Sequence, residues 1–112
     1  MEPLSAAMGA NIAAMTGYGR TEWAEFREEF CSDGINKFTL DTIEKAMFIV
    51  VLDEHAPKDW SDKGYHLIHG TGSSRWFDKS ISLIAFADGQ CGFNVEHSWA
   101  DAPGKIRYII YL

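Results

Sequence analysis

A histidine and a carboxylate four residues apart, His97 and Asp101, are the side chains whose types and spacing best suit chemistry. Both lie in the stretch NVEHSWADAP, residues 94–103. Pro103 disfavours helical geometry at the preceding residue, so a helix that begins at His97 lasts about one turn. One turn brings Asp101 back to His97, and a carboxylate there can fix the imidazole tautomer and raise its basicity. The pair therefore suggests a general base, although a structural, hydrogen-bonded histidine is the commoner case.

A serine offers a second interpretation of the same histidine. Residues 80–87 and 90–97 read as two strands joined by the two-residue loop Asp-Gly, which favours a tight type I′ turn. Counting back from that turn places Ser80 opposite His97, with Cβ atoms about 5 Å apart. Ser80, His97 and Asp101 could then act as nucleophile, base and orienting group of a small serine esterase. Against this, Ser80 lies within a strand and lacks the sharp turn that exposes a nucleophilic serine.

The same count predicts which residues of the hairpin share a face. Side chains alternate along a strand, and cross-strand partners lie on the same side of the sheet. Cys91, Phe93, Val95 and His97 should therefore lie on the core face with Phe86, Ile84, Ser82 and Ser80. His97 becomes the last residue of an apolar face, at the point where the strand ends.

Other candidate sites have weaker patterns. His66 and His69 have metal-ligand spacing, but a third ligand is not evident, so turn or helix histidines are the better interpretation and no metal site is expected. Residues 70–74, Gly-Thr-Gly-Ser-Ser, lack the lysine of a phosphate-binding loop and predict a turn.

Two aromatic residues flanked by charges occupy positions 75–79, Arg75-Trp76-Phe77-Asp78-Lys79. We expect a buried aromatic anchor in which Asp78 pairs with Arg75 or Lys79, rather than a substrate-binding segment.

The segments around these residues predict an α/β fold. Two helices are expected first, one capped by Thr21 and one by Thr39. Residues 48–52, FIVVL, predict a buried strand, and residues 53–65 an exposed loop that precedes the hairpin. The apolar faces of the two helices are formed by Trp23, Phe26 and Phe30 in the first, and by Leu40, Ile43 and Met47 in the second.

Composition limits the classes of function. The 112 residues allow one small domain, and 46% hydrophobic residues suffice for a packed core. A net charge of −6 disfavours nucleic acid as a partner. Cys31 and Cys91 lack metal-ligand spacing, which predicts reduced thiols, both buried as small hydrophobes. The start resembles neither a signal nor a transit peptide, and the longest apolar run, residues 46–52, is too short for a bilayer, so a soluble chain is expected.

Residues 74–103 closely resemble the choline/carnitine acyltransferase family. Members carry an Asn/Asp-Arg-Trp-Phe-Asp-Lys motif, a hairpin, and then Glu-His followed by a carboxylate four residues later, as in Glu96, His97 and Asp101 here. The ending Ser-Trp-Ala-Asp-Ala-Pro is most similar to the carnitine palmitoyltransferase 1 branch. The likeness covers about residues 13–103, while residues 104–112 diverge from the family.

The resemblance implies a fold and a reaction. The chain would be part of the first domain of a two-domain carnitine acyltransferase, transferring fatty acyl groups between coenzyme A and carnitine without an acyl-enzyme. His97 would be the general base, Asp101 its supporting carboxylate, and Ser80 a neighbour of the base. The other residues of the motif would provide structural support, and these are Arg75, Trp76, Phe77, Asp78, Lys79 and Glu96.

It also implies a cellular setting. No bound cofactor is expected, since acyl-coenzyme A and carnitine are substrates, and the location would be the mitochondrial outer membrane, facing the cytosol. The alternatives are a truncated non-catalytic fragment, from a truncated product or an incomplete gene model, and the serine esterase described above.

Overall fold

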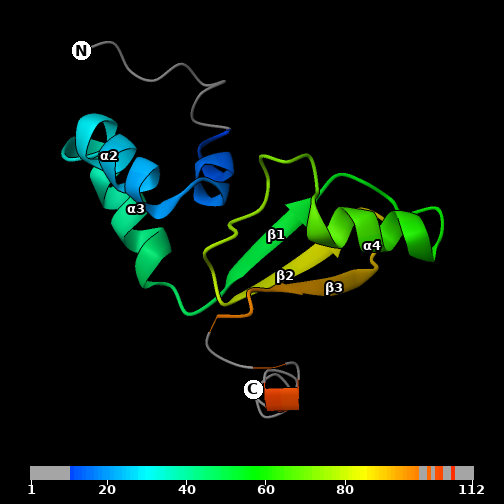
Figure 1. Ribbon diagram of the computed structural model, residues 1–112. Helices are drawn as coiled ribbons and strands as arrows, with labels where there is room; N and C mark the ends of the chain where they lie inside the picture. The colour runs from blue at the N-terminus through cyan, green and yellow to red at the C-terminus, as the bar shows by residue number, and fades with distance from the viewer. Residues whose placement is uncertain (1–10, 99–100, 102, 105–106, 108–112) are drawn as a thin grey trace.

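Short helices and a three-stranded sheet make up the computed structural model, which describes residues 11–98, 101, 103–104 and 107. Helices η1, α2 and α3 precede the first strand, and α4 lies between the first and second strands (Figure 1). The expected α/β class is confirmed. The elements are η1 Ile12–Gly17, α2 Arg20–Phe30, α3 Gly34–Lys45, β1 Ile49–Asp53, α4 Trp60–Ile68, β2 Ile81–Phe86 and β3 Cys91–Val95. No helix within the described part of the chain has the length and apolar composition needed to cross a bilayer.

The sheet has the order β1-β2-β3, with β1 parallel and β3 antiparallel to β2. Parallel neighbours need a crossover connection, usually a helix, and α4 supplies it here. The exposed loop predicted for residues 53–65 is therefore wrong in its second half, because α4 begins at Trp60. The carboxylate of Asp59 accepts a hydrogen bond from the Asp62 N–H and caps this helix.

The hairpin is present, but its register differs by one residue from the prediction. Ile81 pairs with Val95 and Ala85 with Cys91, and the Phe86 N–H donates to the Gln90 carbonyl at 2.8 Å. A type I′ turn needs positive φ at both central residues, yet among the described residues only glycines have positive φ. Gly89, with φ of 84°, instead closes a three-residue loop at residues 87–89.

This shift exchanges the two faces of the hairpin, because a slip of one residue moves every side chain to the other side. Helix α4 covers one face of the sheet (Figure 1), where the Asn94 amide donates to the Leu67 and Ile68 carbonyls at 3.0 and 3.1 Å. The residues of this covered face are Ser82, Ile84, Phe86, Gly92 and Asn94. The predicted grouping of Cys91, Phe93, Val95 and His97 with Phe86, Ile84, Ser82 and Ser80 is therefore wrong.

The opposite side of the sheet is an open apolar face. Phe93 and Val95 of β3 lie there with Val50 and Leu52 of β1, all exposed, Leu52 to 81%. The buried strand predicted for residues 48–52 is thus wrong for its outward-facing half. Cys91 is also exposed on this side, contrary to expectation, whereas Cys31 is fully buried as predicted, and burial raises the pKa of its thiol.

Helices α2 and α3 pack together beside the sheet (Figure 1). Trp23, Cys31 and Leu40 form their core, and the Arg27 guanidinium crosses from α2 to the Asp41 carboxylate on α3. The caps differ from those predicted. Helix α2 starts at Arg20 after Gly19 rather than at Thr21, and α3 starts at Gly34 after Asp33 rather than at Thr39. Phe30 and Met47, expected in the core, are 44% and 66% exposed.

Two glycines test how α4 packs on the sheet. A Cβ added at Gly92 of β3 would lie 2.6 Å from Leu67 Cδ2, so Gly92→Ala must displace α4 or the leucine. Gly64 in α4 has open space around it, so Gly64→Ala gains helix propensity without a clash. In urea titration we expect Gly92→Ala to lower the free energy of unfolding by about 1–3 kcal/mol. Gly64→Ala should raise it by about 0.5–1 kcal/mol, and equal effects would contradict the packing.

Candidate functional site

His97 and Asp101 are in direct contact. The His97 Nε2 and Asp101 Oδ1 atoms are 2.9 Å apart, so the contact predicted from their spacing is confirmed. It does not come from a helical turn, because residues 97, 98 and 101 are not helical. Both side chains are exposed, at 72% and 80%. The carboxylate contacts one nitrogen of the His97 ring, in a position open to solvent.

Ser80 does not stand opposite His97 as the sequence predicted. The ladder between β2 and β3 begins with Ile81 paired to Val95, and the same register extended by one step sets Ser80 opposite Glu96. The cross-strand argument for a Ser80 nucleophile is therefore wrong. Glu96 instead accepts a hydrogen bond from the Ser98 N–H at 2.8 Å.

An open groove of about 500 Å³ lies beside this segment. Glu96 and Ser98, the two sequence neighbours of His97, form part of its wall. The groove offers hydroxyls, two carboxylates and one guanidinium, which suits a polar ligand. Its described lining residues are Thr16, Arg20, Phe77, Asp78, Ser80, Glu96 and Ser98.

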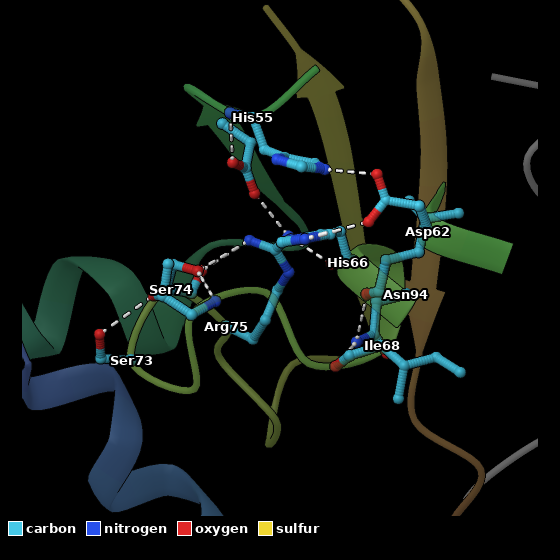
Figure 2. A network of polar contacts seen from close by, with 11 residues as sticks. His55, Asp62, His66, Ile68, Ser73, Ser74, Arg75 and Asn94 are labelled. Atoms are coloured by element: carbon cyan, nitrogen blue, oxygen red, sulfur yellow. Dashed lines mark hydrogen bonds and ion pairs between the residues drawn. The ribbon is translucent and has the colours of Figure 1, made fainter. Parts of the chain in front are cut away.

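Arg75 is buried, only 1% exposed, at the centre of a polar network (Figure 2). Its Nη2 atom lies 2.7 Å from Asp53 Oδ2 and also donates to the His66 carbonyl, while Nη1 donates to Ser74 Oγ at 3.0 Å. Burial opposes ionisation of Asp53, but hydrogen bonds from Arg75 and the His55 N–H outweigh it and lower the pKa of that carboxyl. Arg75 thus ties β1 to the end of α4.

The next residues contact the N-terminal helices. Trp76 packs against the core of α2 and α3, and the Phe77 N–H donates to Thr16 Oγ1 of η1 at 2.9 Å. Asp78 lies 3.5 Å from Arg20 at the start of α2. The predicted pairing of Asp78 with Arg75 or Lys79 is therefore wrong, and so is the expected burial of Phe77, which is 37% exposed.

Lys79 completes this set of contacts. Its buried ammonium donates to the Glu44 and Ala46 carbonyls at 2.8 and 2.7 Å, which satisfies orphan carbonyls at the end of α3. Residues 75–79, hereafter the bracket segment, hold η1, α2, α3, β1 and α4 in place. Their contacts are structural, and only Phe77 and Asp78 also line the groove.

The two histidines considered as metal ligands are not brought together. His69 is exposed and packs on Tyr65, with ring centroids 5.0 Å apart. His66 instead lies beside His55 and Asp62. The pattern of residues 53–65 predicts a loop and so gives no sign of this group, although Asp62 and His66 have helical spacing.

The chain matches one family model and several curated proteins. The Choline/Carnitine o-acyltransferase model matches residues 2–112. The muscle isoform of carnitine O-palmitoyltransferase 1 from Sus scrofa is 52% identical over 99 residues, which cover 82% of this chain and 13% of that protein. The human liver isoform is 44% identical over 102 residues, 84% of this chain and 13% of its own length. The mitochondrial carnitine O-palmitoyltransferase 2 of Rattus norvegicus is 38% identical over 97 residues, 87% of this chain and 15% of its own length.

Proposed function

This chain belongs to the choline/carnitine O-acyltransferase family, and we propose that it carries the general base of a carnitine O-acyltransferase. The proposed base is His97, and the proposed reaction transfers a long fatty acyl group between coenzyme A and carnitine. The observation that carries the proposal is the contact between His97 and Asp101, 2.9 Å long, in a chain 52% identical to a carnitine O-palmitoyltransferase 1.

The chemistry follows from the roles of the two side chains. His97 accepts the proton of the carnitine hydroxyl, and the carnitine oxygen attacks the thioester carbonyl of acyl-coenzyme A. The tetrahedral intermediate then collapses, the carbon–sulfur bond breaks, and the imidazolium returns the proton to the coenzyme A thiolate. Asp101 stabilises the imidazolium formed between these steps. The reverse reaction uses the same groups in the opposite order.

The exposure of His97 and Asp101 supports the proposal that the acyl transfer takes place in a longer protein than this chain. Acyl transfer is fastest in a site from which water is excluded, and both side chains are open to bulk water. The chain spans about 13% of the length of the carnitine O-palmitoyltransferase 1 relatives. We propose that acyl-coenzyme A and carnitine bind within the full length of such a protein. A mitochondrial location is proposed as well, since the Rattus norvegicus relative is named a mitochondrial enzyme.

A chimera tests this function directly. The 99-residue segment of the Sus scrofa relative that matches this chain would be replaced by the corresponding segment of this chain. With palmitoyl-coenzyme A and carnitine, we expect release of coenzyme A that requires carnitine and forms palmitoylcarnitine, measured by thiol titration and mass spectrometry. Ser80→Ala should retain this activity, because Ser80 does not stand opposite His97. Hydrolysis to palmitate that Ser80→Ala abolishes would overturn the proposal in favour of an esterase.

A further inference from the structure

Two histidines and an aspartate gather between α4 and the segment that follows β1. His55 Nε2 lies 2.9 Å from Asp62 Oδ2, and His66 Nε2 lies 3.5 Å from Asp62 Oδ1. Figure 2 shows the two imidazole rings one above the other, both directed at the carboxylate of Asp62. All three side chains are partly buried, between 20% and 28% exposed. None of them belongs to the proposed catalytic pair.

Local structure holds each of the three in place. The Asp59 cap sets the start of α4, so Asp62 and His66, four residues apart, share one face of that helix. The backbone of His55 is fixed at both ends, because its N–H donates to Asp53 Oδ1 and its carbonyl accepts from the Ala87 N–H, each at 3.0 Å. The group is therefore assembled by the fold rather than by flexible side chains alone.

We propose that His55, Asp62 and His66 form a binding site for a divalent transition metal, with Zn²⁺ as the best fit. Their ligand atoms all lie within 4.8 Å of one another. Zinc bonds of about 2.0–2.2 Å in tetrahedral geometry set ligand atoms roughly 3.3 Å apart, close to the 3.5 Å between His66 Nε2 and Asp62 Oδ1. Imidazole nitrogens favour Zn²⁺, Cu²⁺ or Ni²⁺ over Mg²⁺ and Ca²⁺.

The charges around the site are compatible with a cation. Asp62 contributes a carboxylate, held by the Lys58 N–H, that would offset part of the charge of a bound cation. Lys58 N–H lies 3.0 Å from Oδ2, which leaves Oδ1 beside His66 for the metal. Arg75 is the neighbouring buried cation in Figure 2, and Asp53 balances its charge.

Two features limit the affinity. The imidazole rings are stacked, with centroids 3.6 Å apart, and must splay to direct both nitrogens at one ion. Metal binding at His66 Nε2 also moves the ring proton to Nδ1, which is buried without a hydrogen-bond partner in the described part of the chain. Metal-bound histidines normally donate that proton to an acceptor, and loss of such a partner weakens binding by about 10–100-fold. We therefore expect moderate rather than very tight binding.

Isothermal titration of the full 112-residue chain with Zn²⁺ tests the site. We expect saturable binding of one ion, and Co²⁺ in its place should give the visible absorption of a tetrahedral centre. His55→Gln and His66→Gln should each weaken binding at least tenfold. His69→Gln is the matched control, because this exposed histidine lies three residues beyond His66 and outside the site.

Further measurements distinguish binding at this site from binding at other residues, and allow for folding that is induced by the metal. If the chain is unstructured without metal, Zn²⁺ should induce helix by circular dichroism, with the same dependence on His55 and His66. Saturable binding should persist in Cys91→Ser and in His97→Gln. No saturable binding, or a loss that follows His69, Cys91 or His97, would overturn the proposal. Because the readout is metal binding, its failure leaves the acyltransferase proposal untouched.

Discussion

Arg75→Met is expected to lower the free energy of unfolding by about 3–5 kcal/mol, because it leaves the carboxylate of Asp53 buried without its partner. Arg75 is 1% and Asp53 10% exposed, with 2.7 Å between their charged atoms. The substitution also removes the hydrogen bond to the His66 carbonyl. Urea unfolding of the 112-residue chain would measure the change.

The acid dependence of this variant provides a second measurement. In the wild type, Asp53 has a lowered pKa, so its contribution to stability is present above the unfolded pKa of about 3.9 and is lost as pH falls through the folded value. Burial is already the largest single influence on Asp53, and without the opposing Arg75 we expect it to raise the pKa of Asp53 above its unfolded value. The loss of stability in Arg75→Met should therefore be largest near about pH 7 and shrink toward about pH 4.

Two further variants control this experiment. Arg20→Met removes a guanidinium from the exposed pair with Asp78, 3.5 Å apart, and should change stability by only about 0–1 kcal/mol. Asp53→Leu combined with Arg75→Met removes both buried charges and should recover much of the loss. If Arg75→Met were no more harmful than Arg20→Met, Arg75 would not hold β1 to α4.

His97→Ala is expected to lower kcat for palmitoyl transfer in the chimera by about 10²–10⁴-fold, the usual contribution of a general base. Asp101→Asn should lower kcat less, because a carboxylate that is 80% exposed is screened by solvent. Steady-state rates of coenzyme A release, with palmitoyl-coenzyme A and carnitine each at saturation, would measure both effects.

The matched control for this prediction is His69→Ala, which removes another exposed histidine and should leave kcat unchanged. Circular dichroism would establish that the variants fold alike. A His97→Ala chimera that kept its full kcat for palmitoyl transfer would exclude His97 as the base.

The sequence predicted the hairpin and the α/β class correctly, and it placed Asp101 beside His97. These features depend on local patterns, namely an Asp-Gly loop, the alternation of side chains along a strand, and the four-residue spacing of His97 and Asp101. The register was missed because Asp-Gly fits both a two-residue loop and a three-residue loop that ends in a left-handed glycine. The choice between them depends on packing, since Gly92 must face Leu67 for α4 to approach β3.

Longer-range features were not accessible in this way. Helix α4 is only nine residues long and rich in polar groups, so its sequence pattern resembles that of a loop. Its helical state depends on its contact with the sheet. Asp78 is only three positions from Arg75, yet Arg75 pairs with Asp53, which is 22 residues away. Nothing in local spacing distinguishes such a partner, because the fold alone decides which charges are buried together.

The bracket segment also bears on the order in which the chain folds. Phe77 contacts Thr16 across 61 residues, Asp78 contacts Arg20 across 58, and Lys79 contacts the end of α3 across 35. The chain loses conformational entropy when it closes loops of this length, before the stabilising contacts have formed, and this slows folding. During synthesis, η1, α2 and α3 leave the ribosome before the residues that hold them, and we expect these helices to stay loosely associated until position 79 has emerged.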